Sequence, residues 1–252
     1  MSILFSRQRG KGKALIFIHG FPMHQAIWDD FGEKFIEKYT VISIDLPGFG
    51  KSQALPENFS LDDVADEVIA FVLAHKLSDS VLVGHSLGGY VALYVLEKRP
   101  DLFSKLILFH STAYADTNER KASRNKVIDF VKKNGAIAFT SSFIEPLFAD
   151  PQHEGIERVR QIAATTSAET VIGYTKAMRD RREQLKTLIS FEKPTLLLGG
   201  EKDQGIPVES LKEQANSSQK AQIHILQNVA HMGMFESAGE AVTRIKEFLE
   251  EN

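Results

Sequence analysis

The sequence predicts an α/β protein: a mostly parallel central sheet flanked by helices, with a helical cap inserted into it. Two observations lead to this fold class. Short, almost continuous apolar runs recur along the 252 residues, and longer amphipathic stretches separate them. Such runs are typical of strands buried on both faces of a parallel sheet, and their alternation with helices implies right-handed crossovers.

The expected strands are the apolar runs that end in turn residues. The first strong run ends at a histidine–glycine pair, and the second ends before a proline–glycine turn. The full set is 14–18, 41–44, 81–83, 106–109, 195–198 and 222–226, preceded by one short strand around residues 3–7.

Two of the expected helices have clear signals. Ser60 is the predicted N-cap of a helix over 61–75, and Asp62 and Asp63 lie in its first turn, where the helix dipole favours negative charge. An apolar stripe predicts a final helix over 238–250.

The interval from about residue 111 to residue 188 shows no clear strand pattern. Its apolar spacing is helical, as in 126–131 and 156–164. An insertion of roughly 75 residues is far longer than an ordinary connection between strands. We therefore expect residues 1–110 and 189–252 to form the α/β core, and 111–188 to form a helical cap over the sheet's carboxyl edge. A separate helical domain is the alternative, although no Pro/Gly-rich linker marks either end.

The composition argues against several classes of partner. Lys and Arg total 30 against 33 Asp and Glu, and the net charge of −3 gives no electrostatic case for nucleic acid or an anionic membrane. Without cysteine, disulfides and zinc–thiolate sites are impossible, and we expect neither metal nor cofactor. The N-terminus lacks a signal-peptide pattern and no apolar stretch reaches the ~20 residues of a membrane span. We expect a cytoplasmic monomer or homodimer that acts on a small molecule.

The strongest chemical signal is Ser86, which lies between Gly84 and Gly88 in a G-x-S-x-G pattern. The pattern follows the strand 81–83 and opens a predicted helix over 90–98, which is the setting of a nucleophile elbow. So tight a turn requires flanking positions with almost no side chain. Ser86 is therefore the predicted nucleophile.

A serine hydroxyl needs a general base with a pKa near neutrality. Of the eight histidines, His231 lies in a loop between the last strand and the last helix, and this loop opens on the same sheet edge as Ser86. The remaining histidines belong to the elbow, to other loops, to helical segments or to a strand: His19, His24, His75, His85, His110, His153 and His224. His231 is the predicted base.

An acid must orient that imidazole and stabilise its charged form. Asp203 follows the last strand but one, so the chain order is Ser86, Asp203, His231, as in one of the known triad arrangements. Glu201 is a local alternative and Asp116 a distant one.

The tetrahedral intermediate also needs an oxyanion hole, normally made by two backbone N–H groups. Leu87, directly after the nucleophile, can supply one. Phe21, in the loop after the strand 14–18, is the candidate for the other, because the following Pro22 has no N–H.

These motifs together resemble the α/β-hydrolase superfamily. The segments that carry the resemblance are His19-Gly20-Phe21-Pro22, Asp45-Leu46-Pro47-Gly48-Phe49-Gly50-Lys51-Ser52, Gly84-His85-Ser86-Leu87-Gly88-Gly89, Gly200-Glu201-Lys202-Asp203 and Ala230-His231. The nearest likeness is to a small capped branch that contains esterases, enol-lactonases, cofactor-free haloperoxidases and C–C bond hydrolases. Serine at position 86 differs from the aspartate nucleophile of the dehalogenase and epoxide-hydrolase members. A single strand before 14–18 departs from family members that have two.

One further motif resembles part of a nucleotide-binding site. Gly50-Lys51-Ser52 looks like the end of a phosphate-binding P-loop. The full pattern requires glycine where Asp45 stands and a helix immediately afterwards, and residues 53–56 are a poor helix start. We therefore expect no nucleotide site there.

Apolar residues cluster in one part of the expected cap. Phe139, Phe143 and Phe148 are the candidate substrate-binding residues, because an apolar ceiling favours an acyl chain or aromatic group. The alternative is that these apolar side chains only pack the cap against the core. The arginines of 179–182 are interpreted as a solvated helix face, with anion binding as the alternative. Short-chain or aryl esters are accordingly expected to react faster than charged esters.

The predicted function is that of a serine hydrolase, carboxylesterase- or lactonase-like, acting on a small apolar ester through an acyl-enzyme. Two alternatives remain open. One is a C–C bond hydrolase or lyase-like enzyme with the same triad, and the other is a ligand-sensing protein on a hydrolase fold.

Overall fold

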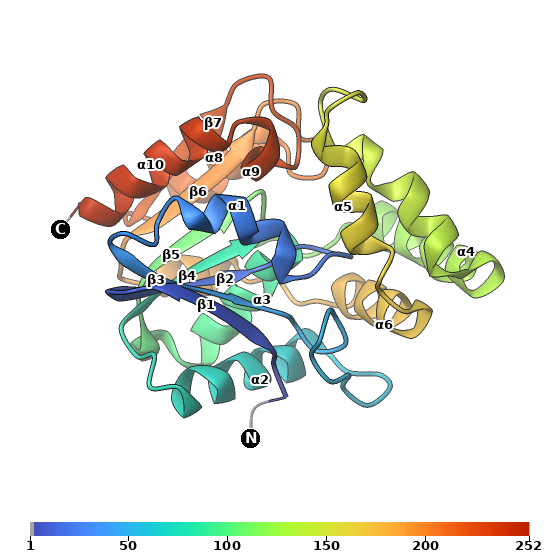
Figure 1. Cartoon of the computed structure of the whole chain (residues 1–252), viewed down its shortest axis with the longest axis horizontal. Helices are drawn as coiled ribbons and strands as arrows, with labels where there is room; N and C mark the ends of the chain where they lie inside the picture. Colours follow the sequence, from blue (N-terminus) through green and yellow to red (C-terminus); the bar gives the residue numbers. More distant parts are fainter. Residues whose placement is uncertain (1–2, 252) are drawn as a thin grey trace.

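A central sheet of seven strands organises the protein, for which a computed structural model describes residues 3–251. The strand order across the sheet is β1-β3-β2-β4-β5-β6-β7. Strand β1 runs antiparallel to β3, and every other pair is parallel. The bounds are β1 (Ser6–Gly10), β2 (Lys13–Ile18), β3 (Tyr39–Ile44), β4 (Ser80–His85), β5 (Phe103–Phe109), β6 (Thr195–Gly200) and β7 (Ala221–Leu226). The predicted fold class, a mostly parallel sheet with flanking helices, is confirmed (Figure 1).

The six strands predicted from apolar runs all fall within observed strands, whereas the first strand is displaced. It covers Ser6–Gly10 instead of residues 3–7, because it lies at the sheet edge and carries little apolar signal. Its arginines pair with acidic groups of the neighbouring helix: Arg7 with Asp29 at 2.9 Å and Arg9 with Glu33 at 2.6 Å. Within residues 3–251 it is the one strand that precedes β2, in agreement with the sequence.

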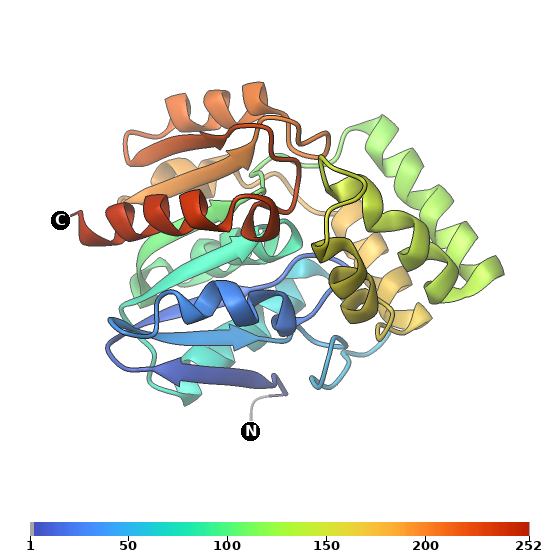
Figure 2. The same ribbon diagram turned by 45° about the horizontal axis from the view of Figure 1, so that its top comes forward.

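The helices cover both faces of the sheet. They are α1 (Asp29–Glu33), α2 (Leu61–Ala74), α3 (Leu87–Lys98), α4 (Asn118–Phe143), α5 (Gly155–Ala163), α6 (Ala168–Arg179), α7 (Leu185–Ser190), α8 (Val208–Ser217), α9 (Gly233–Glu236) and α10 (Ala238–Glu250). Helices α2, α3 and α8 pack on one face, and α1, α9 and α10 pack on the other (Figures 1 and 2).

This two-sided cover explains the continuous apolar runs of the sequence. In β2, Leu15 and Phe17 are buried against one set of helices, while Ile16 and Ile18 are buried against the other. Successive side chains of a strand point to opposite faces, so both faces need apolar residues when both are covered.

Both predicted ends of α10 are observed, and α2 begins at the predicted residue and ends one residue earlier, at Ala74. The Ser60 hydroxyl accepts a hydrogen bond from the backbone N–H of Asp63, and the Asp63 carboxylate accepts one from the backbone N–H of Ser60. This reciprocal capping satisfies two backbone donors that the helix cannot pair itself.

Helices α4, α5 and α6 lie beyond the carboxyl ends of the parallel strands, as Figure 2 shows, and we call them the inserted helices. The chain bends within α4 at Gly135, whose φ of 82° lies in the left-handed region. Two buried hydrogen bonds attach this group to the loops below it: the Thr166 hydroxyl donates to the Pro22 carbonyl at 2.8 Å, and the Tyr174 hydroxyl donates to the Pro47 carbonyl at 2.9 Å.

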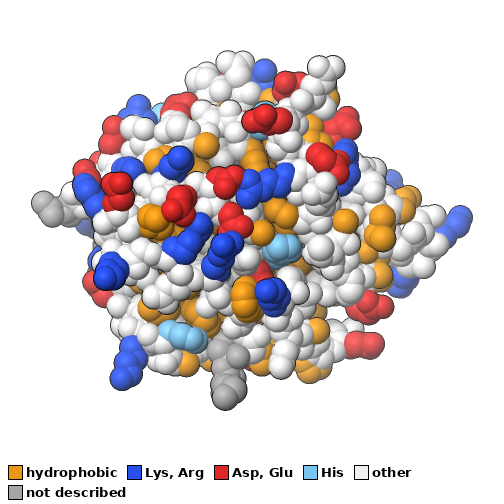
Figure 3. Space-filling model, viewed as in Figure 1, with side chains coloured by type: hydrophobic (Ala, Val, Ile, Leu, Met, Phe, Trp, Pro, Cys, Tyr) orange, Lys and Arg blue, Asp and Glu red, His pale blue; other side chains and the backbone are white. Residues whose placement is uncertain are grey.

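Acidic and basic side chains are interspersed on the face of the molecule shown in Figure 3. No helix within residues 3–251 combines the length and the hydropathy that crossing a membrane requires.

Candidate active site

Ser86 occupies a strained turn between β4 and α3. Its φ of 50° and ψ of −113° are unusual for a residue with a side chain. A Cβ atom at Gly84 would lie 2.5 Å from the backbone of Gly88 and Gly89, and one at Gly88 would meet the backbone of Ile18. The glycines of the motif are therefore required by the tightness of the turn, as the sequence indicated.

Neighbouring strands hold this turn in place. The backbone N–H of Ser86 donates to the Phe109 carbonyl at 3.0 Å, and the Ser111 hydroxyl donates to the Ser86 carbonyl at 2.8 Å. Strain at a single residue costs about 1–3 kcal/mol and persists only where the surroundings impose it. The end of β5 supplies that restraint here.

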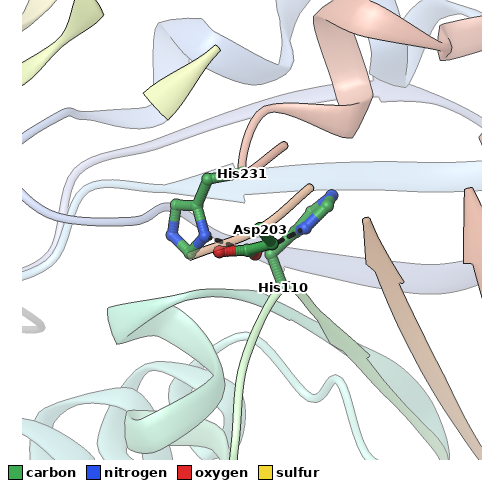
Figure 4. Close-up of side chains that lie close together, drawn as sticks. All are labelled: His110, Asp203 and His231. Atoms are coloured by element: carbon green, nitrogen blue, oxygen red, sulfur yellow. Dashed lines mark hydrogen bonds and ion pairs between the residues drawn. The ribbon is translucent and has the colours of Figure 1, made fainter. Parts of the chain in front are cut away.

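Asp203 and His231 meet at the same edge of the sheet, from the loops that follow β6 and β7. The Nδ1 atom of His231 lies 2.7 Å from Oδ2 of Asp203 (Figure 4). The carboxylate is fully buried, whereas the imidazole is 12% exposed. The structure thus brings together the predicted base and the predicted acid, with the histidine as the more accessible partner.

The Asp203 carboxylate accepts more hydrogen bonds than the predicted pair supplies. Its Oδ1 accepts from the backbone N–H groups of Gly205 at 2.8 Å and Ile206 at 3.0 Å, and its Oδ2 accepts a second bond from Nδ1 of His110 at 3.0 Å. Burial by itself raises the pKa of Asp203, but the charge of His231 and the hydrogen bonds from both histidines outweigh it. The pKa of Asp203 is held well below its usual range, so the group is a carboxylate.

His110 is the residue of this site that the sequence did not assign. It follows β5 directly and is fully buried. Its Nε2 accepts the backbone N–H of Gly233 at 3.2 Å, so its proton lies on Nδ1, facing Asp203. Burial lowers the pKa of His110, and the ring therefore acts as a neutral donor that anchors the carboxylate. Its only signal in the sequence was a histidine directly after a predicted strand.

Two further buried histidines fix the surrounding loops. Nε2 of His19 accepts the backbone N–H of Leu46 at 3.0 Å, while its Nδ1 donates to the Gly20 carbonyl at 2.9 Å. Nε2 of His85 donates to the carbonyl of His231 at 3.0 Å. These rings tie the loops after β2, β3, β4 and β7 to one another.

The two backbone groups predicted for the oxyanion hole have no competing partner. Within residues 3–251, no acceptor lies within hydrogen-bond distance of the N–H of Phe21 or of Leu87. Leu87 is the first residue of α3, and Phe21 lies in the loop after β2. Neither N–H group is thus engaged by another protein group of the described residues, as an oxyanion donor requires.

A cavity of about 280 Å³ opens above these residues. Ser86, His231 and Asp203 all line it. The rest of its lining combines apolar side chains with a few polar ones: Phe21, Tyr90, Arg120, Ser123, Arg124, Val127, Phe143, Pro146, Leu147, Met178, Gln204, Gly205, Ile206 and Ala230. Its size is close to the lower limit for small-molecule sites.

The three phenylalanines proposed for substrate binding have different positions. Phe143 lines the cavity. Phe139 is buried behind it, with its ring 4.9 Å from that of Phe143. Phe148 is also buried, and it stacks on His153 at 5.2 Å. Of the three, Phe143 alone lines this cavity, and the other two pack the inserted helices.

The alternative acids are engaged elsewhere. The Glu201 carboxylate accepts the backbone N–H of Asn228 at 2.9 Å. Asp116 is buried between Arg124, at 2.7 Å, and Arg181, at 2.6 Å.

The structure also shows the surroundings of the arginine run and of the Gly50-Lys51-Ser52 turn. Arg179 pairs with Asp180 at 2.6 Å, and Arg182 pairs with Asp62 at 2.7 Å, so these arginines have acidic partners. The Gly50-Lys51-Ser52 turn is followed by no helix before Leu61, contrary to the geometry of a P-loop.

His110, Asp203 and His231 could each offer one ligand atom within 4.8 Å of the others, as three metal ligands would. However, both histidine Nδ1 atoms approach the same carboxylate oxygen at hydrogen-bond distance. Hydrogen bonds from two imidazole N–H groups to this carboxylate account for the cluster without a metal ion.

Comparisons with known proteins identify the family of the chain. The model of the alpha/beta hydrolase family matches residues 15–245. An esterase from Thermogutta terrifontis, solved with malate bound, superposes with a TM-score of 0.91 at 28% identity, covering 98% of this chain and 92% of the other. The (E)-2-((N-methylformamido)methylene)succinate hydrolase of Acinetobacter baylyi is 28% identical over 89% of this chain and 86% of its own length. A pimeloyl-[acyl-carrier protein] methyl ester esterase of Aliivibrio salmonicida is 38% identical, over 43% of this chain and 40% of its own. The chain belongs to the alpha/beta hydrolase family.

Proposed function

We propose that this protein is a serine hydrolase that cleaves small carboxylic esters or lactones, with Ser86 as nucleophile, His231 as general base and Asp203 as the orienting acid. The observation that carries the proposal is that a strained serine and a histidine–carboxylate pair line one cavity. A strained, half-buried serine that shares a cavity with a carboxylate-bound histidine is the arrangement expected of an activated nucleophile.

The reaction proceeds by acyl transfer. His231 removes the Ser86 proton as the hydroxyl oxygen attacks the ester carbonyl, and the resulting imidazolium is stabilised by Asp203. The imidazolium then donates that proton to the leaving alkoxide, and the acyl group remains on Ser86. A water molecule, deprotonated by His231, attacks the acyl-enzyme, and the carboxylic acid leaves as the proton returns to Ser86.

The N–H groups of Phe21 and Leu87 are the proposed oxyanion donors. Neither has a partner within residues 3–251, and both belong to segments that buried contacts hold rigid. Each such donor contributes about 3 kcal/mol of transition-state stabilisation.

The proposed substrate presents an apolar portion to the wall formed by Phe21, Phe143 and Leu147, as a cap over the sheet edge would provide. Several relatives bear the names of ester-cleaving enzymes, which supports an ester over other acyl bonds. We also propose that residues 111–188 act as this cap and that the enzyme works in the cytoplasm.

The test is a panel of esters, lactones and 1,3-diketones, assayed with the wild-type protein and with Ser86→Ala. We expect hydrolysis of at least one ester or lactone by the wild type and none by the folded variant. Cleavage of diketones alone would replace the proposal with C–C bond hydrolysis. Binding of panel members without turnover of any would replace it with a ligand-sensing role.

A further inference from the structure

One wall of the cavity is cationic, although the sequence predicted an apolar ceiling. Arg120 and Arg124 lie one turn apart on α4, and both line the cavity that contains Ser86 and His231. Both side chains are half-buried, so charge on them is screened less than on an exposed surface.

The acidic groups nearby do not balance this wall. Arg124 shares its one carboxylate partner, Asp116, with Arg181, whose side chain is 2% exposed and lies over the Tyr90 ring at 4.1 Å. Two guanidinium groups therefore share the single negative charge of one buried carboxylate, and Arg124 uses only its Nε atom in that pair.

Arg120 has no carboxylate partner among residues 3–251, and its guanidinium donates to the carbonyl of Gly205. Asp203 is the acidic residue that lines the cavity, and hydrogen bonds from His110 and His231 already engage it. The cavity thus has an excess of positive charge and unused guanidinium donors beside the reacting groups.

We propose that the substrate carries a carboxylate, held by Arg120 and Arg124, in addition to the ester that reacts with Ser86. A carboxylate matches the fork of a guanidinium group, and charge-assisted hydrogen bonds of this kind are roughly twice as strong as neutral ones. The apolar side chains of Phe143 and Val127 suit the short methylene chain that would separate the two functional groups. The expectation that neutral esters react faster than charged ones is thereby reversed. This inference rests on the proposed function for the identity of the reacting bond.

The first experiment compares two esters that differ only in the terminal group, monomethyl adipate and methyl hexanoate. We expect the wild type to have at least tenfold higher kcat/KM for monomethyl adipate. Arg120→Gln and Arg124→Gln should each reduce that ratio at least fivefold, and Arg120→Glu should bring it below one. Lys121→Gln, on the same helix but outside the cavity, is the matched control, and its ratio should equal that of the wild type.

A structural role for Arg120, as a tether between α4 and Gly205, predicts another outcome. Loss of a tether would lower kcat/KM for both esters in proportion and leave the ratio unchanged. An unchanged ratio in Arg120→Gln and Arg124→Gln, or a wild-type preference for methyl hexanoate, would overturn the proposal.

A binding measurement separates this inference from the proposed function. Calorimetric titration of adipate into Ser86→Ala should show binding that weakens at least fivefold in the double variants Ser86→Ala/Arg120→Gln and Ser86→Ala/Arg124→Gln. If no ester is hydrolysed but adipate binds in this pattern, the acyl-transfer proposal fails and the carboxylate site stands. If esters are hydrolysed and adipate binding is equal in all three proteins, the carboxylate site fails alone.

Discussion

The two sides of the cavity are built in different ways. Below it, the loops at the carboxyl edge of the sheet are joined by buried hydrogen bonds, with His110, His19 and His85 as fully buried connectors. Above it, α4 contributes side chains that are only half-buried, among them Phe143 and Arg120. We call these two sides the floor and the roof.

This difference in construction predicts that the floor determines the rate of turnover and the roof determines the substrate preference. Buried hydrogen bonds from three histidines hold the loops of the floor, so a change there alters the geometry of the reacting groups for any substrate. The side chains of the roof line the cavity and have few partners of their own, so a change there is expected to alter which substrate is preferred. Substitutions in the floor should therefore lower turnover of all esters, and those in the roof should change their ranking.

The largest effect is expected from Asp203→Asn in the floor. The amide removes the acceptor that both His231 and His110 use, so His231 loses the tautomer required of a general base. Turnover of every ester should fall on the order of 10⁴-fold. Glu201→Gln is the matched control, and its turnover should stay close to that of the wild type. A greater loss in Glu201→Gln than in Asp203→Asn would make Glu201 the orienting acid.

An effect of intermediate size is expected on the free energy of unfolding at acidic pH, through the buried His19 of the floor. Burial lowers the pKa of His19 to about 4, from 6.5 for the unperturbed group. Between these values the unfolded chain binds a proton that the folded chain does not, so the free energy of unfolding decreases as the pH falls from 6.5 to 4. The contribution of His19 to this loss is about 3 kcal/mol.

Urea unfolding of the wild type and of His19→Gln, at several pH values in that range, measures this contribution. The variant has no group to protonate at position 19, so its stability should decline less steeply with acidification. Equal slopes for the two proteins would mean that His19 is not held neutral by the fold.

The smallest effect is expected in the roof, from Phe143→Ala. This side chain lines the cavity, so its loss should lower kcat/KM for hexanoyl esters about tenfold, with a much smaller change for acetyl esters. Phe130→Ala is the control on the same helix, because Phe130 is 42% exposed and outside the cavity lining. An equal decrease in kcat/KM for hexanoyl and acetyl esters would mean that Phe143 affects turnover in general, as the residues of the floor do, and not the preference for acyl length.

The sequence predicted the fold well for the strands that are covered by helices on both faces of the sheet. Strands β2 to β7 and helices α2 and α10 followed from continuous apolar runs and from cap residues, since those patterns reflect local chemistry. The edge strand β1 was misplaced by three residues because its residues are Ser, Arg, Gln and Gly, and no apolar run marks it.

The positions of the candidate site residues could be predicted for the floor but not for the roof. Ser86, Asp203 and His231 were chosen because chain order and strand ends place loops on one edge of the sheet. His110 was missed because its role depends on two contacts, Asp203 and Gly233, that come from distant segments. Arg120 was missed because an arginine on a polar helix has the same local pattern whether it faces solvent or a cavity.

Covalent labelling shows directly whether Ser86 is the activated nucleophile. The wild type is incubated with a fluorophosphonate, and intact-mass and peptide measurements count and locate the adducts. We expect a single adduct per chain, on Ser86, and none on the folded Ser86→Ala variant. An adduct on a different residue, or an unlabelled wild type that is fully folded, would contradict the account.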